Sequence, residues 1–565
     1  MGKSLTHRVC GEASQTSGIA TANLKFAARP YANASECEEN MKKSKVYWCL
    51  IILSVIGVLG LSFIPKLVNS GSGSGKKQFI VGFDAEFPPY GYLDENGEYV
   101  GFDLDLAEEV CRRNNWELVK RPISWEAKDS ELSSGTISCI WNGFTMNGRE
   151  DQYTWSTPYV DNSQVVVVKK SSGIKSLSDL EGKILVVQKE SSALAALTGE
   201  DVSRENEDLL KSLKSLEQVD DYNFAFMNLE TGAIDAIAMD IGVAHYQLEN
   251  KRDDYIILDE HISSEKYGIG FKLGNTKLRD EVQSTILEML YDGTFEHISE
   301  KWGLTDSVCL TFDDTKYIDG MEVPAIDTSS IEKIDFGNED VKEASKSTDR
   351  SISNTIKQLL KGMVTTLEIF ALTLIFSMPL GLLLTFVRMS KVKVLQWIAK
   401  IYISIMRGTP LMLQLLVVFF APYYVFGINT SYNYRFYAVI IGFSLNYAAY
   451  FAEIYRSGIQ GIPNGQREAA MIMGYGKIKT FTKIIFPQMI KRVMPPVTNE
   501  IITLVKDTSL AFALAYTEMF TMAKQISSAQ ASLTPLFVAG LFYYIFNFIV
   551  AFVMEKLEKS MEYYR

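Results

Sequence analysis

Asp84 and Phe87 stand where a ligand contact is expected in an α/β protein. They directly follow the strand-like run Phe79–Phe83, and Pro88 and Pro89 favour an extended loop after it. Ligands of open α/β sheets bind beyond the carboxyl ends of the strands. We therefore expect Asp84 to receive the amide or basic head group of a ligand, and Phe87 to lie against that ligand.

Asp240, Ser191 and Ser192 form a second candidate set. Asp240 ends an apolar run that is typical of a buried strand, so its carboxylate needs a partner, which a ligand ammonium would provide. Ser191 and Ser192 follow the strand-like run Ile184–Gln188 and precede a helical run. The amides and hydroxyls of such a helix N-terminus could receive a carboxylate. The alternative for Asp240 is a helix N-cap.

The elements that must position these residues alternate between strands and helices. Strands are expected at 79–83, 164–169 and 184–188, and a helical stretch is expected at 280–302. Such alternation is typical of an α/β fold with mostly parallel sheets. We expect this fold over residues 76–304.

The average composition of the 565 residues conceals two different parts. The chain is 47% hydrophobic and 22% charged, with a net charge of −11, which gives no reason to expect nucleic-acid binding. Most of the charge lies in residues 76–350, whereas 363–555 consists of long apolar runs, so a soluble and a membrane module share one polypeptide. The six cysteines show no CxxC spacing, and Cys111 and Cys139 are expected to be buried thiols.

The first 75 residues contain an export signal. Residues 1–40 are expected to be disordered, or to precede a true start at Met41. Lysines then precede the uncharged run 46–64, which is long enough to cross a bilayer. Within the segment 41–75 this run is either a cleaved signal peptide or a retained anchor, and a Gly/Ser linker follows it at 70–75.

The second half of the chain is expected to cross the membrane about five times. The candidate spans are 364–388, 410–427, 436–455, 495–520 and 534–555. Basic residues gather in the first and third connections, while the other two connections hold only Arg435 and Lys524. Because basic residues stay on the cytoplasmic side, this block starts outside and its C-terminus lies inside. That orientation agrees with an exported soluble module, joined through a polar tether at 305–350 to a membrane module at 351–565.

The soluble module contains a series of recognisable motifs. They are FDAEFPPY at 83–90, GFDLDLA at 101–107, WNGFT at 141–145, WSTPY at 155–159 and YDGTF at 291–295, followed by Trp302. Over about 79–303 the module resembles the periplasmic-type solute-binding proteins for polar amino acids, family 3. The resemblance implies a bilobal α/β fold of type II, whose two lobes close over an amino acid.

The resemblance also implies roles for individual residues. It assigns Arg149 to the α-carboxylate of the ligand and Asp240 to the α-ammonium, with Thr145 and the backbone of Asn142 and Gly143 adding polar contacts. A guanidinium binds a carboxylate through two parallel hydrogen bonds and does not deprotonate, which suits a zwitterion. The alternatives are a surface ion pair for Arg149, with the acidic residues that follow it, and a role in strand packing for Thr145.

Three further residues complete the expected ligand site. Phe87 and Trp125 could sandwich the ligand side chain, although aromatic residues in such a domain more often belong to the core. Gln188 stands where some relatives have lysine, so an ionic contact is absent there.

Another motif lies between the third and fourth candidate spans. Glu468, Ala469 and Ala470 are followed after three residues by Gly474, and nine residues later by the run 484–487, which ends at Pro487. This spacing resembles the cytoplasmic EAA loop of permeases of type I ABC importers, with Phe486 in place of the usual leucine. In those proteins the loop transmits the motion of an ATPase dimer to the membrane spans.

The residues of this loop predict its local structure. Pro463 and Gly465 should break the preceding helix, and 466–473 should form a short helix that stops at Gly474. Two adjacent alanines make one face of that helix narrow enough to enter a groove on a cytoplasmic partner.

Glu500 lies within the fourth candidate span, which is expected to open at Pro495 and Pro496. Ionisable residues within a span usually face a bundle interior or a water-filled cavity. We hypothesise that Glu500 lines the translocation path, with solvation at the cytoplasmic end as the alternative.

The sequence holds no GxxxxGK[ST] phosphate loop. ATP is therefore expected on a separate ATPase subunit, and this chain is expected to be a transport subunit, not an enzyme, without a metal or cofactor of its own. About five spans make half a pathway, which implies a dimer, most simply a homodimer, with a heterodimer still open.

We therefore expect the receptor and transmembrane subunit of an ATP-dependent importer for polar amino acids in the plasma membrane. A ligand-gated ion channel and a membrane-anchored sensor are the alternatives. The channel is disfavoured because the spans follow an uninterrupted soluble module without a TVGYG filter, and the sensor needs a cytoplasmic output domain. The ligand stays open among glutamine, arginine, lysine, histidine, glutamate and cystine, and Asp84 favours glutamine or a basic amino acid.

Overall fold

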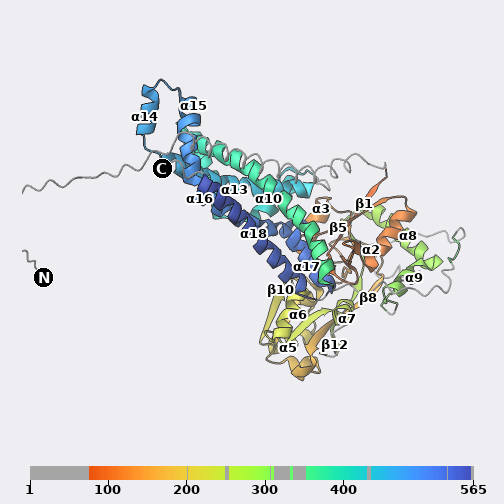
Figure 1. Ribbon diagram of the computed structural model, residues 1–565. Helices are drawn as coiled ribbons and strands as arrows, with labels where there is room; N and C mark the ends of the chain where they lie inside the picture. The colour runs from red at the N-terminus through yellow and green to blue at the C-terminus, as the bar shows by residue number, and fades with distance from the viewer. Residues whose placement is uncertain are drawn as a thin grey trace, which may run out of the picture.

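The computed structural model describes two modules that lie end to end (Figure 1). The described residues are 76–199, 202–248, 254–305, 307–310, 331–334, 351–428, 434–530 and 532–560. Those up to 310 form an α/β module, and those from 351 onward form a helical module. The disorder expected at 1–40, the export segment at 41–75 and most of the tether at 305–350 lie outside the described residues.

The first lobe of the α/β module is built on a five-stranded sheet of order β5-β1-β6-β13-β7. Its strands are β1 (Gln78–Phe83), β5 (Glu117–Pro122), β6 (Cys139–Ile140), β7 (Thr154–Trp155) and β13 (Gly270–Phe271). Its helices are α2 (Phe102–Arg113), α3 (Lys128–Ser133), α8 (Thr276–Asp292) and α9 (Thr294–Lys301). β1 pairs in parallel with β5 and β6, whereas β13 is antiparallel to its neighbours. The strand expected at 79–83 is confirmed.

The second lobe has its own five-stranded sheet, of order β10-β9-β11-β8-β12. Its strands are β8 (Val160–Lys169), β9 (Ile184–Gln188), β10 (Ser215–Val219), β11 (Ala236–Asp240) and β12 (Tyr255–Tyr267). Its helices are α4 (Ser192–Thr198), α5 (Arg204–Ser212), α6 (Tyr222–Thr231) and α7 (Ile241–Leu248). β11 is buried along its whole length because helices cover both faces of this sheet. A chain that enters this lobe at β8 and leaves it after β12 makes the bilobal fold expected from the motifs.

A small sheet extends the first lobe toward the helical module. It consists of β2 (Glu86–Phe87), β3 (Gly91–Leu93) and β4 (Tyr99–Val100), in the loop that follows β1. Cys111 and Cys139 are 3% and 0% exposed, so the expectation of buried thiols is confirmed.

The helical module contains long apolar helices with shorter ones between them. They are α10 (Ile352–Arg388), α11 (Lys393–Gly408), α12 (Leu411–Phe426), α13 (Tyr434–Gln460), α14 (Gly465–Ile472), α15 (Lys477–Thr480), α16 (Phe486–Asp507), α17 (Met519–Gln530) and α18 (Thr534–Ser560). By length and composition, α10, α13 and α18 could each cross a membrane, and α11 with α12, bent by 115°, gives up to four spans among the described residues.

The fourth expected span, 495–520, is wrong in its bounds. α16 begins at Phe486 and ends at Asp507, so Pro495 and Pro496 lie inside it and do not open it. After a 3₁₀ turn, Ala515 takes a left-handed conformation (φ 47°), which turns the chain into the separate helix α17. Proline is tolerated within such helices because neighbouring groups satisfy the freed backbone carbonyls.

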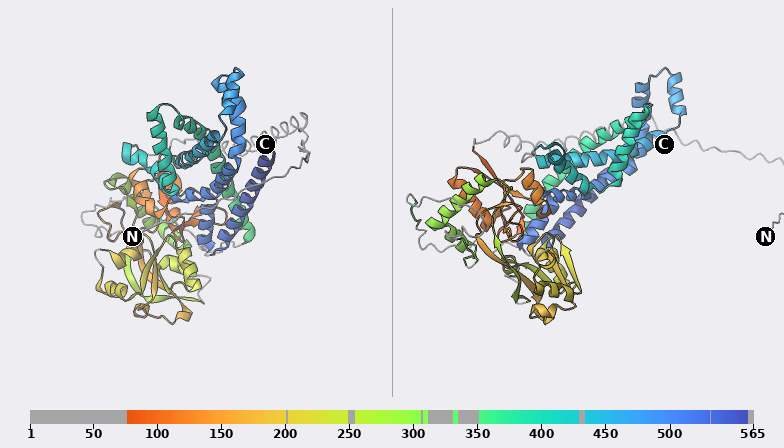
Figure 2. Two further views of the ribbon diagram at one scale, coloured as in Figure 1. Left: turned by 90° about the vertical axis from the view of Figure 1, so that its left-hand side faces the viewer. Right: turned by 180° about the vertical axis from the view of Figure 1, so that it is seen from behind.

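The two modules place their expected functional segments at opposite ends of the molecule. The α/β module covers the end of the helical module that carries α17, whereas α14 and α15 project from the far end (Figures 1 and 2). The described end of α18 lies on the same side as α14 and α15 (Figure 1). This separation agrees with the distribution of basic residues along the sequence.

Candidate ligand site between the two lobes

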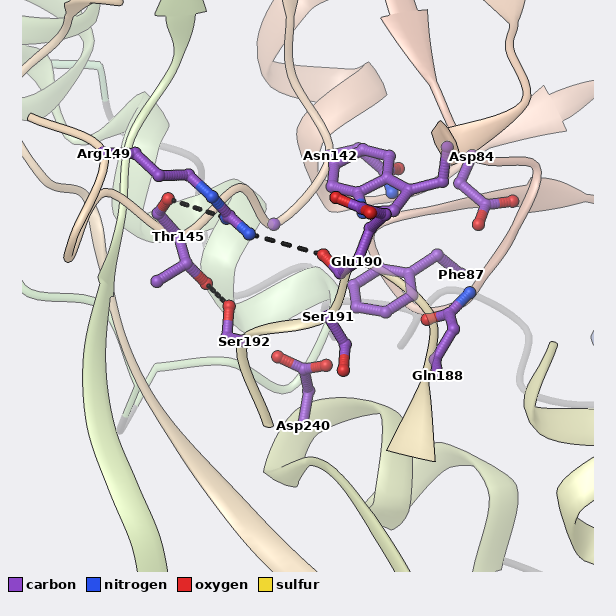
Figure 3. A pocket seen from close by; sticks show the side chains of 12 residues that line it. Asp84, Phe87, Asn142, Thr145, Arg149, Gln188, Glu190, Ser191, Ser192 and Asp240 are labelled. Carbon is purple, nitrogen blue, oxygen red and sulfur yellow. Dashed lines mark hydrogen bonds between the residues drawn. The ribbon is translucent and has the colours of Figure 1, made fainter. Parts of the chain in front are cut away.

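A single cavity between the lobes brings together all the residues expected to contact a ligand (Figure 3). It is lined by Asp84, Phe87, Trp125, Asn142, Gly143, Thr145 and Arg149 from the first lobe, and by Gln188, Glu190, Ser191, Ser192 and Asp240 from the second. Its volume of about 30 Å³ holds no more than a few water molecules, so the lobes are closed in this structure and must separate to admit an amino acid.

Asp103 anchors the loop that carries the first group of these residues. Its carboxylate is fully buried and accepts hydrogen bonds from the Gly143 amide at 2.6 Å and from the Tyr159 hydroxyl at 2.8 Å. Burial raises the pKa of Asp103 to about 7, against the opposing effect of these two bonds. The GFDLDLA, WNGFT and WSTPY motifs are therefore tied together at one buried carboxylate.

The N–H of Gly143 is used inside the protein in this structure. Because its N–H donates to Asp103, that group is already satisfied inside the protein. Gly143 has a φ of 55°, and a Cβ there would stand 3.0 Å from both Phe87 and Tyr267. Its contribution to the site is therefore a left-handed turn and the absence of a side chain.

Arg149 spans the cavity from the first lobe to the second. Its guanidinium donates to the main-chain oxygens of Thr145 and Glu190, both at 3.3 Å, and stacks over the Phe144 ring at 5.4 Å. The alternative of an ion pair with the neighbouring acidic residues 150 and 151 is not seen among the described residues. Long hydrogen bonds to neutral carbonyls leave this cation available to a carboxylate ligand.

Asp240 ends β11 and enters the cavity from the second lobe. Three donors converge on its Oδ1: the amides of Asn162 (2.8 Å) and Gln164 (2.7 Å), and the hydroxyl of Tyr267. Burial raises the pKa of Asp240, and these three hydrogen bonds lower it. They fix the orientation of the carboxylate at the end of the strand.

A chain of hydroxyl groups joins the two lobes beside Asp240. Ser192 donates to the Thr145 hydroxyl at 2.7 Å, and Thr145 donates to Glu265 at 2.6 Å. Glu265 is 4% exposed, and burial followed by the charge of Asp240 raises its pKa to about 7. The role of Thr145 is therefore not limited to strand packing, because its hydroxyl forms hydrogen bonds that connect the two lobes at the cavity wall.

The other end of the cavity is formed by Asp84 and aromatic side chains. Asp84 accepts a hydrogen bond from the Glu86 amide at 2.8 Å, and burial raises its pKa to about 6. Phe87 stacks on Tyr90 with ring centroids 5.7 Å apart, and Trp125 meets Phe144 edge-on at 5.4 Å. Gln188 donates to the main-chain oxygen of Asp220 at 3.2 Å, which holds its side chain at the rim.

Two acidic residues of this region were not expected from the sequence. Glu190 has a φ of 56° and lines the cavity next to the serines that begin α4. Glu265 lies on β12, a strand that no motif marked. A positive φ is not visible in a sequence, and the burial of Glu265 depends on the pairing of β12 with β8, whose register shifts near His261.

The short helix expected near Gly474 is present at the far end of the helical module. α13 ends at Gln460 before Pro463, α14 runs from Gly465 to Ile472, and Gly474 has a φ of 77°. Glu468 stands in the first turn of α14, and Pro487 stands in the first turn of α16.

The face of α14 differs from the expected one. Ala470 is only 2% exposed, so Glu468 and Ala469 form the narrow exposed face without it. Large apolar residues are exposed around them: Met471 (65%), Ile472 (88%), Met473 (73%) and Ile478 (82%).

A second cavity, of about 470 Å³, lies in the helical module. It is lined by Arg407, Glu453, Ile454, Arg456, Ser457, Gly458, Arg492, Val493 and Pro496. Glu500 lies on α16 one helical turn beyond Pro496, and it is not among the residues that line this cavity.

Two families match the two modules. Residues 79–305 match the bacterial extracellular solute-binding proteins of family 3, and residues 377–563 match the inner membrane components of binding-protein-dependent transport systems.

Individual relatives cover each module almost completely. The arginine transport system permease protein ArtQ of Bacillus subtilis is 35% identical over 214 residues, which are 37% of this chain and 96% of that protein. A putative glutamine transport system permease protein GlnP of Rickettsia felis is 34% identical over 204 residues, which are 36% of this chain and 92% of that protein. A crystal structure of a histidine-bound ABC uptake transporter substrate-binding protein from Streptococcus pneumoniae is 33% identical, with a TM-score of 0.39, and covers 41% of this chain and 95% of that one. The chain therefore belongs to the permease family of amino-acid ABC importers, and it carries a family 3 extracellular solute-binding domain in the same polypeptide.

Proposed function

We propose that the α/β module binds an amino acid through Arg149 and Asp240 and delivers it to the helical module of its own chain. The observation that carries this proposal is the convergence of one guanidinium and one carboxylate, from different lobes, on a single cavity. Arg149 binds the α-carboxylate, with Ser191 and Ser192 at the N-terminus of α4, and Asp240 binds the α-ammonium. Thr145 and the backbone of Asn142 supply further polar contacts.

The substrate that suits this site best is glutamine or a basic amino acid. Asp84 lies on the opposite side of the cavity from Arg149 (Figure 3), where the ligand side chain would end, and Phe87 and Trp125 also line the cavity. A carboxylate there accepts a hydrogen bond from an amide and pairs with a guanidinium or an ammonium. The named substrates of the two permease relatives, arginine and glutamine, belong to these classes.

Energy for transport comes from a separate ATPase subunit that docks on α14, so the chain itself has no enzymatic activity. The large exposed apolar residues around Glu468 and Ala469 support this assignment, because apolar side chains that gather on an exposed element are typical of a protein contact. Gly474 and Pro487 fix the ends of the loop that transmits motion to α16.

Two copies of the chain form the translocation pathway in the plasma membrane. The helical module offers only three to four candidate spans among the described residues, which is half of a pathway. We assign the α/β module to the extracytoplasmic side, α14 and the end of α18 to the cytoplasm, and Glu500 to the wall of the pathway beside the charged cavity.

The decisive experiment measures binding by the full chain in lipid nanodiscs. Thermal unfolding is followed in the presence of each of the twenty amino acids and cystine. Stabilisation by glutamine or by a basic amino acid is the expected result. Stabilisation by none of these compounds would contradict the assignment of the ligand site.

A further inference from the structure

Helix α17 of the helical module contacts both lobes of the α/β module. It packs against β2 and β3 of the first lobe and against α6 of the second. Figure 1 places α17 where the helical module meets the α/β module, near α6. The hydroxyl of Ser528 donates to the Glu86 main-chain oxygen at 2.7 Å, and the hydroxyl of Tyr246 donates to the Ala529 main-chain oxygen at 3.0 Å.

Lys524 stands at the centre of this contact, between two carboxylates from different lobes. Its Nζ is 3.4 Å from Oε1 of Glu86 on β2 and 3.4 Å from Oδ2 of Asp221. Asp221 belongs to the second lobe, where its other oxygen, Oδ1, accepts the Phe224 amide at 2.9 Å and caps α6. The side chains of these three charged residues are each no more than 20% exposed.

Lys524 lies against both acidic groups, and its ion pair with Asp221 joins the helical module to the second lobe. Burial raises the pKa of Glu86 to about 8, the charge of Lys524 lowers it, and the charge of Asp221 raises it. Removal of one partner from a buried ion pair leaves an uncompensated charge, which is far more costly than the loss of an exposed pair. The Lys524 ammonium therefore contacts Glu86 and Asp221 at the same time only while the two lobes hold these side chains close together.

The first lobe is attached to the helical module independently of Lys524. Arg435 pairs with the buried carboxylate of Glu131 and donates to the Pro122 main-chain oxygen at 2.7 Å. The side chain of Gln358 donates to the Glu95 main-chain oxygen at 2.6 Å. These contacts all reach the first lobe, so they persist whether the lobes are open or closed.

The sequence gives an independent reason to single out these two cations. Arg435 and Lys524 are the only basic residues in the two connections that the charge distribution places outside the membrane. The structure puts both of them in ion pairs with the α/β module.

We propose that Lys524 detects closure of the α/β module: Arg435 holds the first lobe permanently, and Lys524 holds the second lobe through Asp221 only while the two lobes are closed, a state that a bound ligand favours. A contact that forms only in the closed state must also favour that state, because the coupling between docking and ligand binding is reciprocal. Opening of the lobes for release then requires the helical module to withdraw Lys524 from Asp221. This inference rests on the proposed function for the nature of the ligand.

The test compares the ligand affinity of full-length variants in nanodiscs, with glutamine and arginine as the probes in isothermal titration. Lys524→Met and Asp221→Asn are each expected to weaken binding by about tenfold, since either change removes the ion pair between α17 and the second lobe. Asparagine still caps α6, so the second variant keeps the local fold. Lys361→Met is the matched control, because the Lys361 ammonium donates to the Asn96 main-chain oxygen of the first lobe.

The double variant distinguishes a direct contact from two separate effects. If Lys524 acts through Asp221, the double variant that combines Lys524→Met and Asp221→Asn binds the ligand as tightly as the single variant with the lower affinity. An affinity of Lys524→Met within about twofold of the parent would overturn the proposal, and so would fully additive losses in the double variant.

A second measurement does not depend on the identity of the ligand. If the parent binds neither probe, the proposed substrate class is wrong, and amide hydrogen exchange without ligand then tests Lys524 alone. The amides at the start of α6, including that of Phe224, are expected to exchange faster in Lys524→Met than in the parent and in Lys361→Met. Equal exchange in all three proteins would overturn the proposal.

Discussion

The guanidinium of Arg149 in the first lobe donates to the main-chain oxygen of Glu190 in the second lobe, at 3.3 Å. Its hydrogen bond to the Thr145 main-chain oxygen has the same length, so both are long contacts to neutral acceptors. A carboxylate that replaced them would form two shorter, charge-assisted bonds with the same donors. Arg149 is thus held close to the position in which it would bind a ligand.

Replacement of Arg149 by alanine is expected to weaken amino-acid binding by about a hundredfold, because a charge-assisted bidentate contact is lost. Arg149→Lys should recover only part of the affinity, since an ammonium lacks the planar pair of donors. Titration calorimetry on the full chain measures both, with Arg204→Ala, an exposed site on α5, as the control. Undiminished binding by Arg149→Ala would rule out its role in the site.

The Asp84→Asn substitution is expected to change which amino acid the site prefers, and not only the affinity with which it binds. An asparagine still accepts a hydrogen bond from the amide of glutamine, but it no longer pairs with a guanidinium or an ammonium. We expect affinity for arginine to fall about tenfold more than affinity for glutamine, which competition binding measures directly. Equal losses for both ligands would place the ligand side chain elsewhere in the cavity.

The stability of the α/β module should depend on the ionisation of Asp103. Burial raises the pKa of Asp103 from 3.8 to about 7. Because the folded-state pKa is raised, this stabilising contribution is present at low pH and is lost as the pH rises through 7. Asp103→Asn removes the ionisable group and therefore lacks this dependence.

Chemical unfolding followed by tryptophan fluorescence tests this expectation between pH 5 and pH 7.5. The parent should lose stability relative to Asp103→Asn by about 1.4 kcal/mol per pH unit from pH 5 to about pH 6.5, and this loss should level off above pH 7. Asp208→Asn, whose carboxylate is 83% exposed, serves as the control. A difference between parent and Asp103→Asn that does not change with pH would contradict the role of this carboxylate.

Changes on α14 should separate ligand binding from ATP hydrolysis. Ile472→Asp places a charge in the exposed apolar face, and Glu468→Ala removes the acidic group beside it. Both variants are expected to bind the amino acid with parent affinity but to lose at least about tenfold in ligand-stimulated ATPase activity with the partner subunit. Leu273→Asp, at a 64% exposed site on the α/β module, should retain full stimulation, whereas normal coupling in Ile472→Asp would exclude α14 as the docking element.

The local structure around the ligand site was predictable because each motif follows a buried strand. Asp84 follows β1, the segment Gln188–Ser192 begins at the last residue of β9, and Asp240 is the last residue of β11. The carboxyl ends of these three strands meet at the cavity. The same reasoning failed for the span 495–520, because hydropathy does not reveal that Ala515 takes a left-handed conformation and redirects the chain.

The sequence alone determined the family, the order of the two modules and the residues that line the cavity apart from Glu190, since all of these depend on local motifs and on their periodicity. Tertiary structure alone decided which distant charges meet. Glu265 enters the site only through the pairing of β12, and Lys524 lies between Glu86 and Asp221, which precede it by hundreds of residues. The physical reason is that a buried ion pair is fixed by the packing of whole modules against each other, and no local pattern along the chain records that packing.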